Sequence, residues 1–258
     1  MLYSFGAFFV SLAIFIPRLL PEKLDLYTDQ EKNLSGDSTD ISESDAPHGV
    51  TVISLLRDPN YTLAALAGCM GYFQYDYLGP ILAPRLAELS LSQTQIGLFF
   101  TICAVVYIAT CFSLPWVARK TKKRTVIIIG LLASCPANLL MGPSQLLSLP
   151  AENLWLIGLG QALLGLFDPF ILVFCLPEMI ELAEKKHPNL SPKEKARLAD
   201  VTSSLLTSVL GIGQITGPVF AATFAQSFGF RLTCDVVAIA CFCLGVVYLC
   251  FQRKSSML

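Results

Sequence analysis

The chain has 258 residues, of which 54% are hydrophobic and 14% charged, and its formal net charge is −1. The charges are clustered, because residues 89–118, 125–151 and 201–229 contain none. Each of these stretches exceeds the roughly 20 residues that a helix needs to cross a bilayer. A water-soluble fold is excluded, since a soluble core does not need helices that are apolar on every side. We therefore predict an all-α membrane protein.

The first 60 residues divide into an apolar and a polar part. Residues 1–16 are apolar but few for a complete span, and they lack the basic start and small-residue cleavage site of a signal peptide. We predict a short or partial transmembrane span here. Residues 17–60 hold nine acidic and four basic residues. Low hydrophobicity and clustered like charges favour disorder, so this segment is predicted to be an acidic disordered linker.

Six transmembrane helices are predicted in residues 61–251. The three charge-free stretches supply three of them. The other three are 61–82, 154–176 and 232–251, and each contains one aspartate, respectively Asp76, Asp168 and Asp235. The connection 178–200 is predicted as the longest loop of this block, with a short amphipathic surface helix.

The distribution of basic residues predicts the orientation. If segment 17–60 faces the cytoplasm, the loops on its side hold 16 of the 18 Lys and Arg residues, and only Arg85 and Arg231 lie on the other side. Loops rich in Lys and Arg remain on the cytoplasmic side. We therefore predict that segment 17–60 and the tail 252–258 are cytoplasmic.

Asp168 is the one charged residue of stretch 154–176. A carboxylate at the centre of a span costs about 2.5–3.5 kcal/mol on insertion scales, and such residues often mark ion or proton pathways. Helical spacing places Gln161, Gly165 and Asp168 on one face, which we expect to point into the bundle. Pro169 removes a backbone donor and is expected to kink the helix. The alternative is an interhelical hydrogen bond made by a protonated Asp168.

Asp76 lies in an aromatic stretch, close to Tyr72 and Tyr75. A carboxylate beside phenol rings suits a cation, because the ring faces add cation–π attraction to the charge pairing. We predict ligand contact for these three residues. The alternative is an aromatic belt at the membrane interface, where Tyr is common.

Gln214 lies in residues 211–218, where three glycines and a proline occur within one predicted span. Small residues let helices approach closely. Packing alone would explain the glycines, and Gln214 is the residue predicted to face a pore. Asp200 is interpreted as a cap at a helix start, and Asp235 as a local ion-pair partner of Arg231.

The remaining residue types indicate no cofactor. All nine cysteines lie in the apolar stretches, and both histidines lie in predicted loops without metal-ligand spacing. We expect reduced packing cysteines, no metal, no other cofactor and no nucleic-acid partner. The basic residues 119–124 are explained by topology, and contact with anionic lipids is an additional expectation.

The order of these features resembles the C-terminal half of a transporter of the major facilitator superfamily. Within that superfamily the chain is most similar to the vesicular amine transporter family, particularly its polyamine-transporting branch. Residues 115–124 resemble the basic loop between the eighth and ninth helices. Asp168 matches a carboxylate of the tenth helix, and Gly217-Pro218 resembles the Gly-Pro motif of the eleventh. The resemblance covers essentially the whole chain.

The resemblance implies a six-helix C-terminal bundle of a major facilitator fold and proton-coupled exchange of amines in an intracellular vesicle membrane. Monoamine carriers have an aspartate in the eleventh helix, where this chain has Thr207 and Ser208, which favours a polyamine. Asp76 and Asp168 would hold its charges together. Carriers of this fold place their site between two halves, so the chain is expected to need an N-terminal half or a second chain.

Two other functions are considered. The chain could be a structural or interaction protein with several spans. It could also be an intramembrane aspartyl protease that uses paired aspartates, although Phe167 breaks the usual Gly-x-Gly-Asp pattern. We predict a transport protein and not an enzyme.

Overall fold

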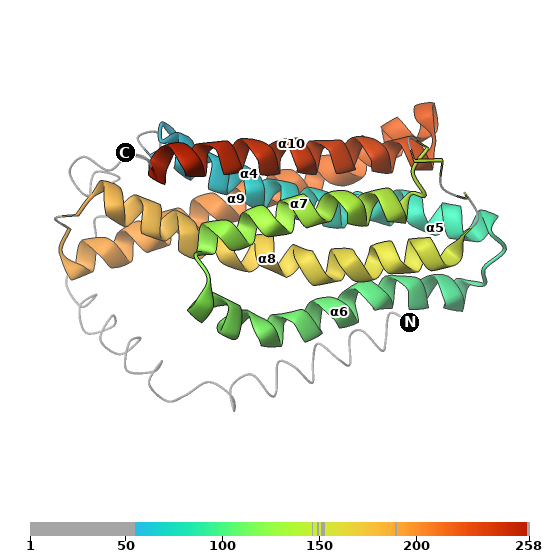
Figure 1. Cartoon of the computed structure of the whole chain (residues 1–258), viewed down its shortest axis with the longest axis horizontal. Helices are drawn as coiled ribbons and strands as arrows, with labels where there is room; N and C mark the ends of the chain where they lie inside the picture. Colours follow the sequence, from blue (N-terminus) through green and yellow to red (C-terminus); the bar gives the residue numbers. More distant parts are fainter. Residues whose placement is uncertain (1–54, 146, 149, 151–152, 189, 257–258) are drawn as a thin grey trace, which may run out of the picture. The chain divides into compact units, whose positions relative to one another are not determined.

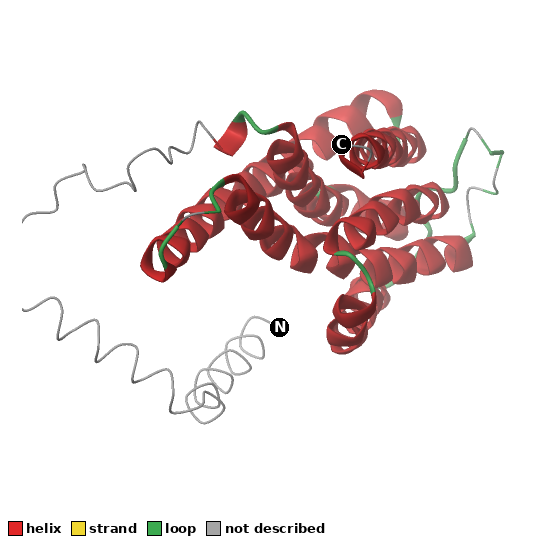
Figure 2. Ribbon diagram, turned by 60° about the vertical axis from the view of Figure 1, so that its left-hand side comes forward, coloured by secondary structure: helices red, strands yellow, loops and turns green. Residues whose placement is uncertain are grey.

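The computed structural model describes residues 55–256, except 146, 149, 151–152 and 189 (Figure 1). The predicted span 1–16 and nearly all of the linker 17–60 lie outside the described residues. Within the described part the regular secondary structure is helical, and it contains no strand (Figure 2). The all-α prediction is confirmed.

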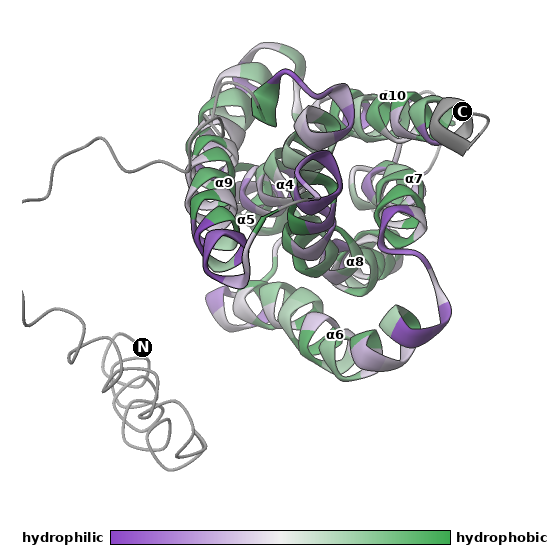
Figure 3. Cartoon of the chain, turned by 90° about the vertical axis from the view of Figure 1, so that its left-hand side faces the viewer, coloured by the Kyte–Doolittle hydropathy of each residue, from purple (hydrophilic) through white to green (hydrophobic). Residues whose placement is uncertain are grey.

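Seven helices make up the described part of the chain. They are α4 (Pro59–Asp76), α5 (Leu78–Glu88), α6 (Gln93–Lys120), α7 (Lys123–Met141), α8 (Leu154–Lys186), α9 (Pro192–Phe228) and α10 (Phe230–Ser256). Five of them, α6 to α10, are long and apolar enough to cross a membrane. Apolar residues predominate along these helices (Figure 3). The chain is an integral, multi-pass membrane protein.

The predicted span 61–82 is divided between α4 and α5 at Tyr77. The backbone of Tyr77 remains in the right-handed helical region, with φ −62° and ψ −23°, and its N–H bonds to the carbonyl of Phe73 at 3.0 Å. The two helices therefore run end to end (Figure 1). With 18 residues, α4 alone is about 27 Å long and slightly short of the roughly 30 Å hydrocarbon core. We interpret α4 and α5 together as the sixth span.

The prediction of a long loop over 178–200 is wrong. α8 continues to Lys186, and α9 begins at Pro192. The early start of α9 has a local cause, because Ser191 caps the helix and forms a capping box with Glu194. Asp200, predicted as a cap, therefore lies inside α9. The charged residues near the end of α8 extend a membrane helix and do not form a separate surface helix.

The end of the bundle where α8 ends and α9 begins, on the left of Figure 1, is called the basic end. Glu181 of α8 is paired here with Lys123 of α7 at 2.9 Å and with Lys185 at 2.7 Å. Arg124 donates to the side-chain oxygen of Asn60 at 2.8 Å. The opposite end is called the Arg231 end. Of the described basic residues, only Arg85 and Arg231 lie there. This asymmetry agrees with the predicted loop charges, and the cytoplasmic assignment of the basic end stays a prediction.

α8 is the central helix, and it packs against α4, α6, α7 and α9. It passes through Pro169 without ending. Small residues allow its closest contact with α6, because a Cβ at Gly165 would lie far inside van der Waals distance of the Cys103 carbonyl. The same holds between α9 and α4, where a Cβ at Gly213 would collide with the carbonyl of Cys69. For Gly213, packing explains the glycine.

We expect Gly213→Ala to destabilise the bundle by about 1–3 kcal/mol, because the added methyl group meets backbone that cannot rotate away. Gly211→Ala is a matched control on the same helix, since a Cβ there meets nothing within 4 Å, and alanine is the better helix former. Thermal unfolding of the purified full chain should show a lower midpoint for Gly213→Ala only. Equal midpoints for the two variants would contradict this packing.

Candidate functional site

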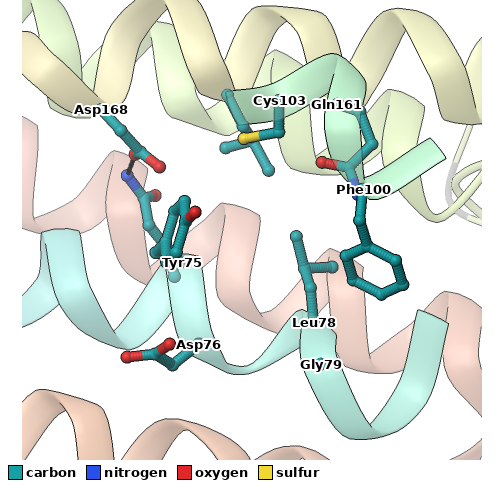
Figure 4. A pocket seen from close by; sticks show the side chains of 10 residues that line it. Tyr75, Asp76, Leu78, Gly79, Phe100, Cys103, Gln161 and Asp168 are labelled. Carbon is teal, nitrogen blue, oxygen red and sulfur yellow. Dashed lines mark hydrogen bonds between the residues drawn. The ribbon is translucent and has the colours of Figure 1, made fainter. Parts of the chain in front are cut away.

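A cavity of about 190 Å³ lies between α4, α5, α6 and α8 (Figure 4). Its lining combines two carboxyl groups and two amides with apolar and aromatic side chains. The lining residues are Gln74, Tyr75, Asp76, Leu78, Gly79, Phe100, Cys103, Gln161, Leu164 and Asp168. Four of the six residues predicted from sequence as site residues are therefore brought to one cavity, namely Asp168, Asp76, Tyr75 and Gln161.

Asp168 is completely buried in α8. One of its carboxylate oxygens accepts a hydrogen bond from the side-chain amide of Gln74 in α4. The other oxygen, Oδ2, is also buried and has no hydrogen-bond partner among the described residues. In Figure 4 this second oxygen points toward the space between Tyr75 and Cys103. A buried carboxylate with one unsatisfied oxygen is costly, so the arrangement suits a group that binds a proton or a cation.

Gln74 fixes the position of Asp168 through contacts to two further helices. Its Nε2 also donates to Oγ of Ser134 in α7 at 3.1 Å, and its Oε1 accepts from Sγ of Cys241 in α10 at 3.1 Å. All four side chains are buried. Because both ends of the amide are engaged, Gln74 presents its N–H group to Asp168. Gln74 was not predicted as a site residue, although it is an amide inside a predicted span.

A second buried pair supports the junction between α4 and α5. The hydroxyl of Tyr77 donates to Oδ1 of Asn138 at 2.5 Å, and Nδ2 of Asn138 donates to the carbonyl of Ser134 at 2.9 Å. Ser134 therefore links the two groups, because its hydroxyl oxygen accepts from Gln74 and its carbonyl accepts from Asn138. Both residues of the pair are fully buried. No local sequence pattern indicates this pair, because its members come from helices separated in the chain.

Asp76 and Asp168 line the same cavity but do not face each other. Asp76 is half-buried, and in Figure 4 its carboxylate points away from Asp168. The ring of Tyr75, which is 43% exposed, lies on the side of α4 that faces Asp168. Adjacent residues on a helix point in different directions, which explains this separation. The hydrogen-bond partner of Asp168 is Gln74. That Asp76 and Asp168 hold the charges of one polyamine together stays a prediction.

The two charged residues among the described lining of the cavity, Asp76 and Asp168, are both acidic. Among the described residues that line it, none is Lys or Arg, and the ion pairs of the described residues do not include Asp76 or Asp168. Two carboxyl groups without a basic partner in a membrane domain favour the uptake of positive charge, as a proton or as a cationic ligand.

Tyr72 and Gln214, also predicted as site residues, do not line the cavity. Tyr72 is half-buried on α4, and the side chain of Gln214 is exposed on α9. Asp235 lies outside the cavity as well. It is fully buried in α10, and its Oδ2 accepts from the backbone N–H of Gln145 at 3.1 Å. This bond ties the turn after α7 to α10, which is a structural role.

The family model of the Major Facilitator Superfamily matches residues 64–256, which includes every residue that lines the cavity. A comparison with curated proteins gave no match.

Proposed function

This chain belongs to the Major Facilitator Superfamily, whose members are transporters and not enzymes, and from that premise we propose that it is the C-terminal half of a proton-coupled antiporter for organic cations of the polyamine class. The observation that supports this most directly is the buried carboxylate of Asp168. One of its oxygens has no partner among the described residues and faces a cavity without Lys or Arg. A proton and an ammonium group would compete for that oxygen.

The proposed exchange follows from this competition. When Asp168 is protonated, it is neutral and holds an ammonium group weakly. When the proton leaves, the carboxylate can bind the cation through a charge-assisted hydrogen bond. Gln74 would hold the carboxylate in place in both states through the same N–H group. A carrier that opens alternately to an acidic and a neutral compartment would then move protons and cations in opposite directions.

A polyamine fits the arrangement of the two carboxyl groups. Asp168 and Asp76 line one cavity yet point in different directions, so a single compact ammonium group would not contact both. A flexible chain with charged groups several ångströms apart could place one charge near each. The exposed ring of Tyr75 lies between these positions and offers a cation–π contact to the connecting chain.

The other wall of the site would come from an N-terminal half, on the same polypeptide or on another chain. Carriers of this fold bind substrate near the midplane between their two halves. Polar side chains of α9, including Gln214 and Thr207, are exposed at membrane depth, where contact with lipid tails is unfavourable for the Gln214 amide. We propose that this surface faces the N-terminal half and a water-filled path. An intracellular vesicle membrane is the proposed location.

A split-carrier experiment tests the proposal. Vesicles with an acidic interior would contain this chain alone, the N-terminal half of a proton-coupled polyamine carrier alone, or both. We expect uptake of labelled spermidine only when both are present, and a protonophore should abolish it. Uptake by this chain alone at the same rate would contradict the half-carrier. A stable pair that binds no spermidine would favour the alternative, a structural or interaction role.

A further inference from the structure

A second cavity, called the basic-end cavity, lies where α6 ends and α7 begins, beside α8 and α10. Its volume is about 520 Å³, within the range of about 300–1,000 Å³ that is common for small-molecule sites. Its lining residues are Ala118, Thr121, Lys122, Lys123, Arg124, Glu178, Glu181, Leu182, Lys185 and Gln252. None of them lines the cavity that contains Asp168, so the two sites are separate.

Glu178 of α8 is an acceptor without a donor in this cavity. The residue is 6% exposed, and among the described residues its carboxylate makes no hydrogen bond and no ion pair. Glu181, three residues further along α8, is by contrast paired with Lys123 at 2.9 Å and with Lys185 at 2.7 Å. A buried carboxylate without a donor is costly. Glu178 therefore suits a ligand that brings N–H donors and a positive charge.

Two basic residues of the lining contact no carboxylate among the described residues. Lys122 is exposed and is in no ion pair. Arg124 donates to the side-chain oxygen of Asn60 at 2.8 Å, and its guanidinium carbon lies 5.0 Å from the centre of the Tyr248 ring. Both partners of Arg124 are neutral, and its Nε has no hydrogen-bond partner among the described residues. Arg124 attracts Glu178 at longer range, but the two form no ion pair.

The start of α7 adds to the attraction for an anion. α7 begins at this cavity, at Lys123, and its N-cap residue Lys122 makes no side-chain hydrogen bond to the helix start. The free N–H groups at the start of a helix favour negative charge. The cavity therefore has one place for a positive group, at Glu178, and one for a negative group, at Lys122, Arg124 and the start of α7.

The cavity lies at the boundary of the membrane. Glu178 comes two residues after the stretch 154–176, and Gln252 comes directly after the predicted span 232–251. Trp116 of α6 is 62% exposed, and tryptophan is enriched at membrane–water interfaces. The polar headgroups of phospholipids occupy this depth, outside the hydrocarbon core. A headgroup is therefore the ligand source nearest to the cavity.

We propose that the basic-end cavity binds a phosphoethanolamine group, with its ammonium at Glu178 and its phosphate at Lys122, Arg124 and the start of α7. A primary ammonium has three N–H donors for the carboxylate that lacks one. A phosphate accepts charge-assisted hydrogen bonds from lysine and arginine. The group has two sources, the headgroup of phosphatidylethanolamine or a soluble phosphoethanolamine, and the depth of the cavity favours the lipid. This site is independent of the proposed transport.

The test uses the purified full chain in two arms. In the first arm, phosphatidylethanolamine, phosphatidylcholine or phosphatidylglycerol is titrated into detergent micelles that contain the protein, and native mass spectrometry gives the dissociation constant of the first bound lipid. In the second, soluble phosphoethanolamine is titrated. The variants are Glu178→Met, which keeps nearly the shape of glutamate, and Lys122→Gln. Glu184→Met is the matched control, because Glu184 lies on the same helix but does not line the cavity.

We expect phosphatidylethanolamine to bind about tenfold more tightly than phosphatidylcholine, whose quaternary ammonium has no N–H to donate to Glu178. Glu178→Met should abolish this preference, and Glu184→Met should keep it. Lys122→Gln should weaken the binding of both lipids about two- to fivefold, because both contain the phosphate and exposed charge contacts are weak. Binding of soluble phosphoethanolamine that depends on Glu178 identifies a soluble ligand, and the lipid preference without it identifies the headgroup.

Equal affinity for phosphatidylethanolamine and phosphatidylcholine, without binding of soluble phosphoethanolamine, would overturn the proposal. So would a preference that Glu178→Met and Glu184→Met reduce equally. Tighter binding of phosphatidylglycerol than of phosphatidylethanolamine would show that the basic residues act alone, without Glu178. If Glu178→Met does not fold, Lys122→Gln decides, because it changes an exposed residue. Phosphatidylethanolamine binding that Lys122→Gln leaves unchanged would then show that the phosphate is not held here.

Discussion

Replacing Asp168 with Asn is expected to reduce proton-driven polyamine transport by the assembled carrier about 100-fold or more, the size expected for losing one partner of a buried charge pair. Asparagine has nearly the same shape and keeps an oxygen that can accept from Gln74. The fold should therefore persist while the exchangeable proton and the negative charge are lost. Uptake of labelled spermidine into acidic vesicles, normalised to the amount of folded protein, measures the effect.

Asp235→Asn is the matched control for this prediction. Asp235 is also a completely buried aspartate of the same bundle, but it lies outside the cavity and accepts from the backbone of Gln145. Its replacement should leave spermidine uptake by the folded protein within about threefold of the original, since it removes no contact to the cation. If both variants lost transport equally, Asp168 would have no special role.

Replacing Gln74 with Leu is the second large change that we expect. Leucine would leave both oxygens of the Asp168 carboxylate without a donor, and removing a hydrogen bond to a buried charged group costs about 1.5–3 kcal/mol. Spermidine affinity should therefore fall about 10- to 100-fold. Gln74 also contacts Ser134 and Cys241, so some loss of thermal stability is expected as well.

A double-mutant cycle separates the positioning role of Gln74 from its packing. In the Asp168→Asn background the carboxylate charge is already gone, so Gln74→Leu should lower the spermidine affinity much less than in the original chain. Cys103→Ala, at another residue that lines the cavity, provides a control variant that adds no hydrogen-bond donor near Asp168. Strictly additive effects of Gln74→Leu and Asp168→Asn would show that the two residues act independently.

The spans could be predicted because charge and hydropathy act locally along the chain. The three stretches without charge form α6, α7 and α9, and two of the stretches that contain one aspartate form α8 and α10. Helix ends were less predictable. The charged residues around Ser191 suggested a loop, but the capping box of Ser191 and Glu194 starts α9 there. The hydroxyl of Tyr77, at the junction of α4 and α5, donates to Asn138 in α7, and a contact 61 residues away leaves no local pattern.

The site was predictable only in part, for a related reason. Asp168 was identified because an aspartate in a membrane span is costly wherever it lies. Its partner Gln74 is 94 residues away, and an amide in a span is a weaker signal than a charge. The role of Asp76 stays a prediction, because helical spacing tells which residues share a face but not which neighbouring helix that face meets.

The most direct test of the account is the number of protons released when the assembled carrier binds spermidine. Calorimetric titrations in buffers of different ionisation enthalpy give this number. At a pH where Asp168 carries its proton in the absence of substrate, we predict the release of about one proton for each spermidine bound, and none for Asp168→Asn. Spermidine binding by the original chain without proton release, or with equal release by Asp168→Asn, would contradict exchange at Asp168.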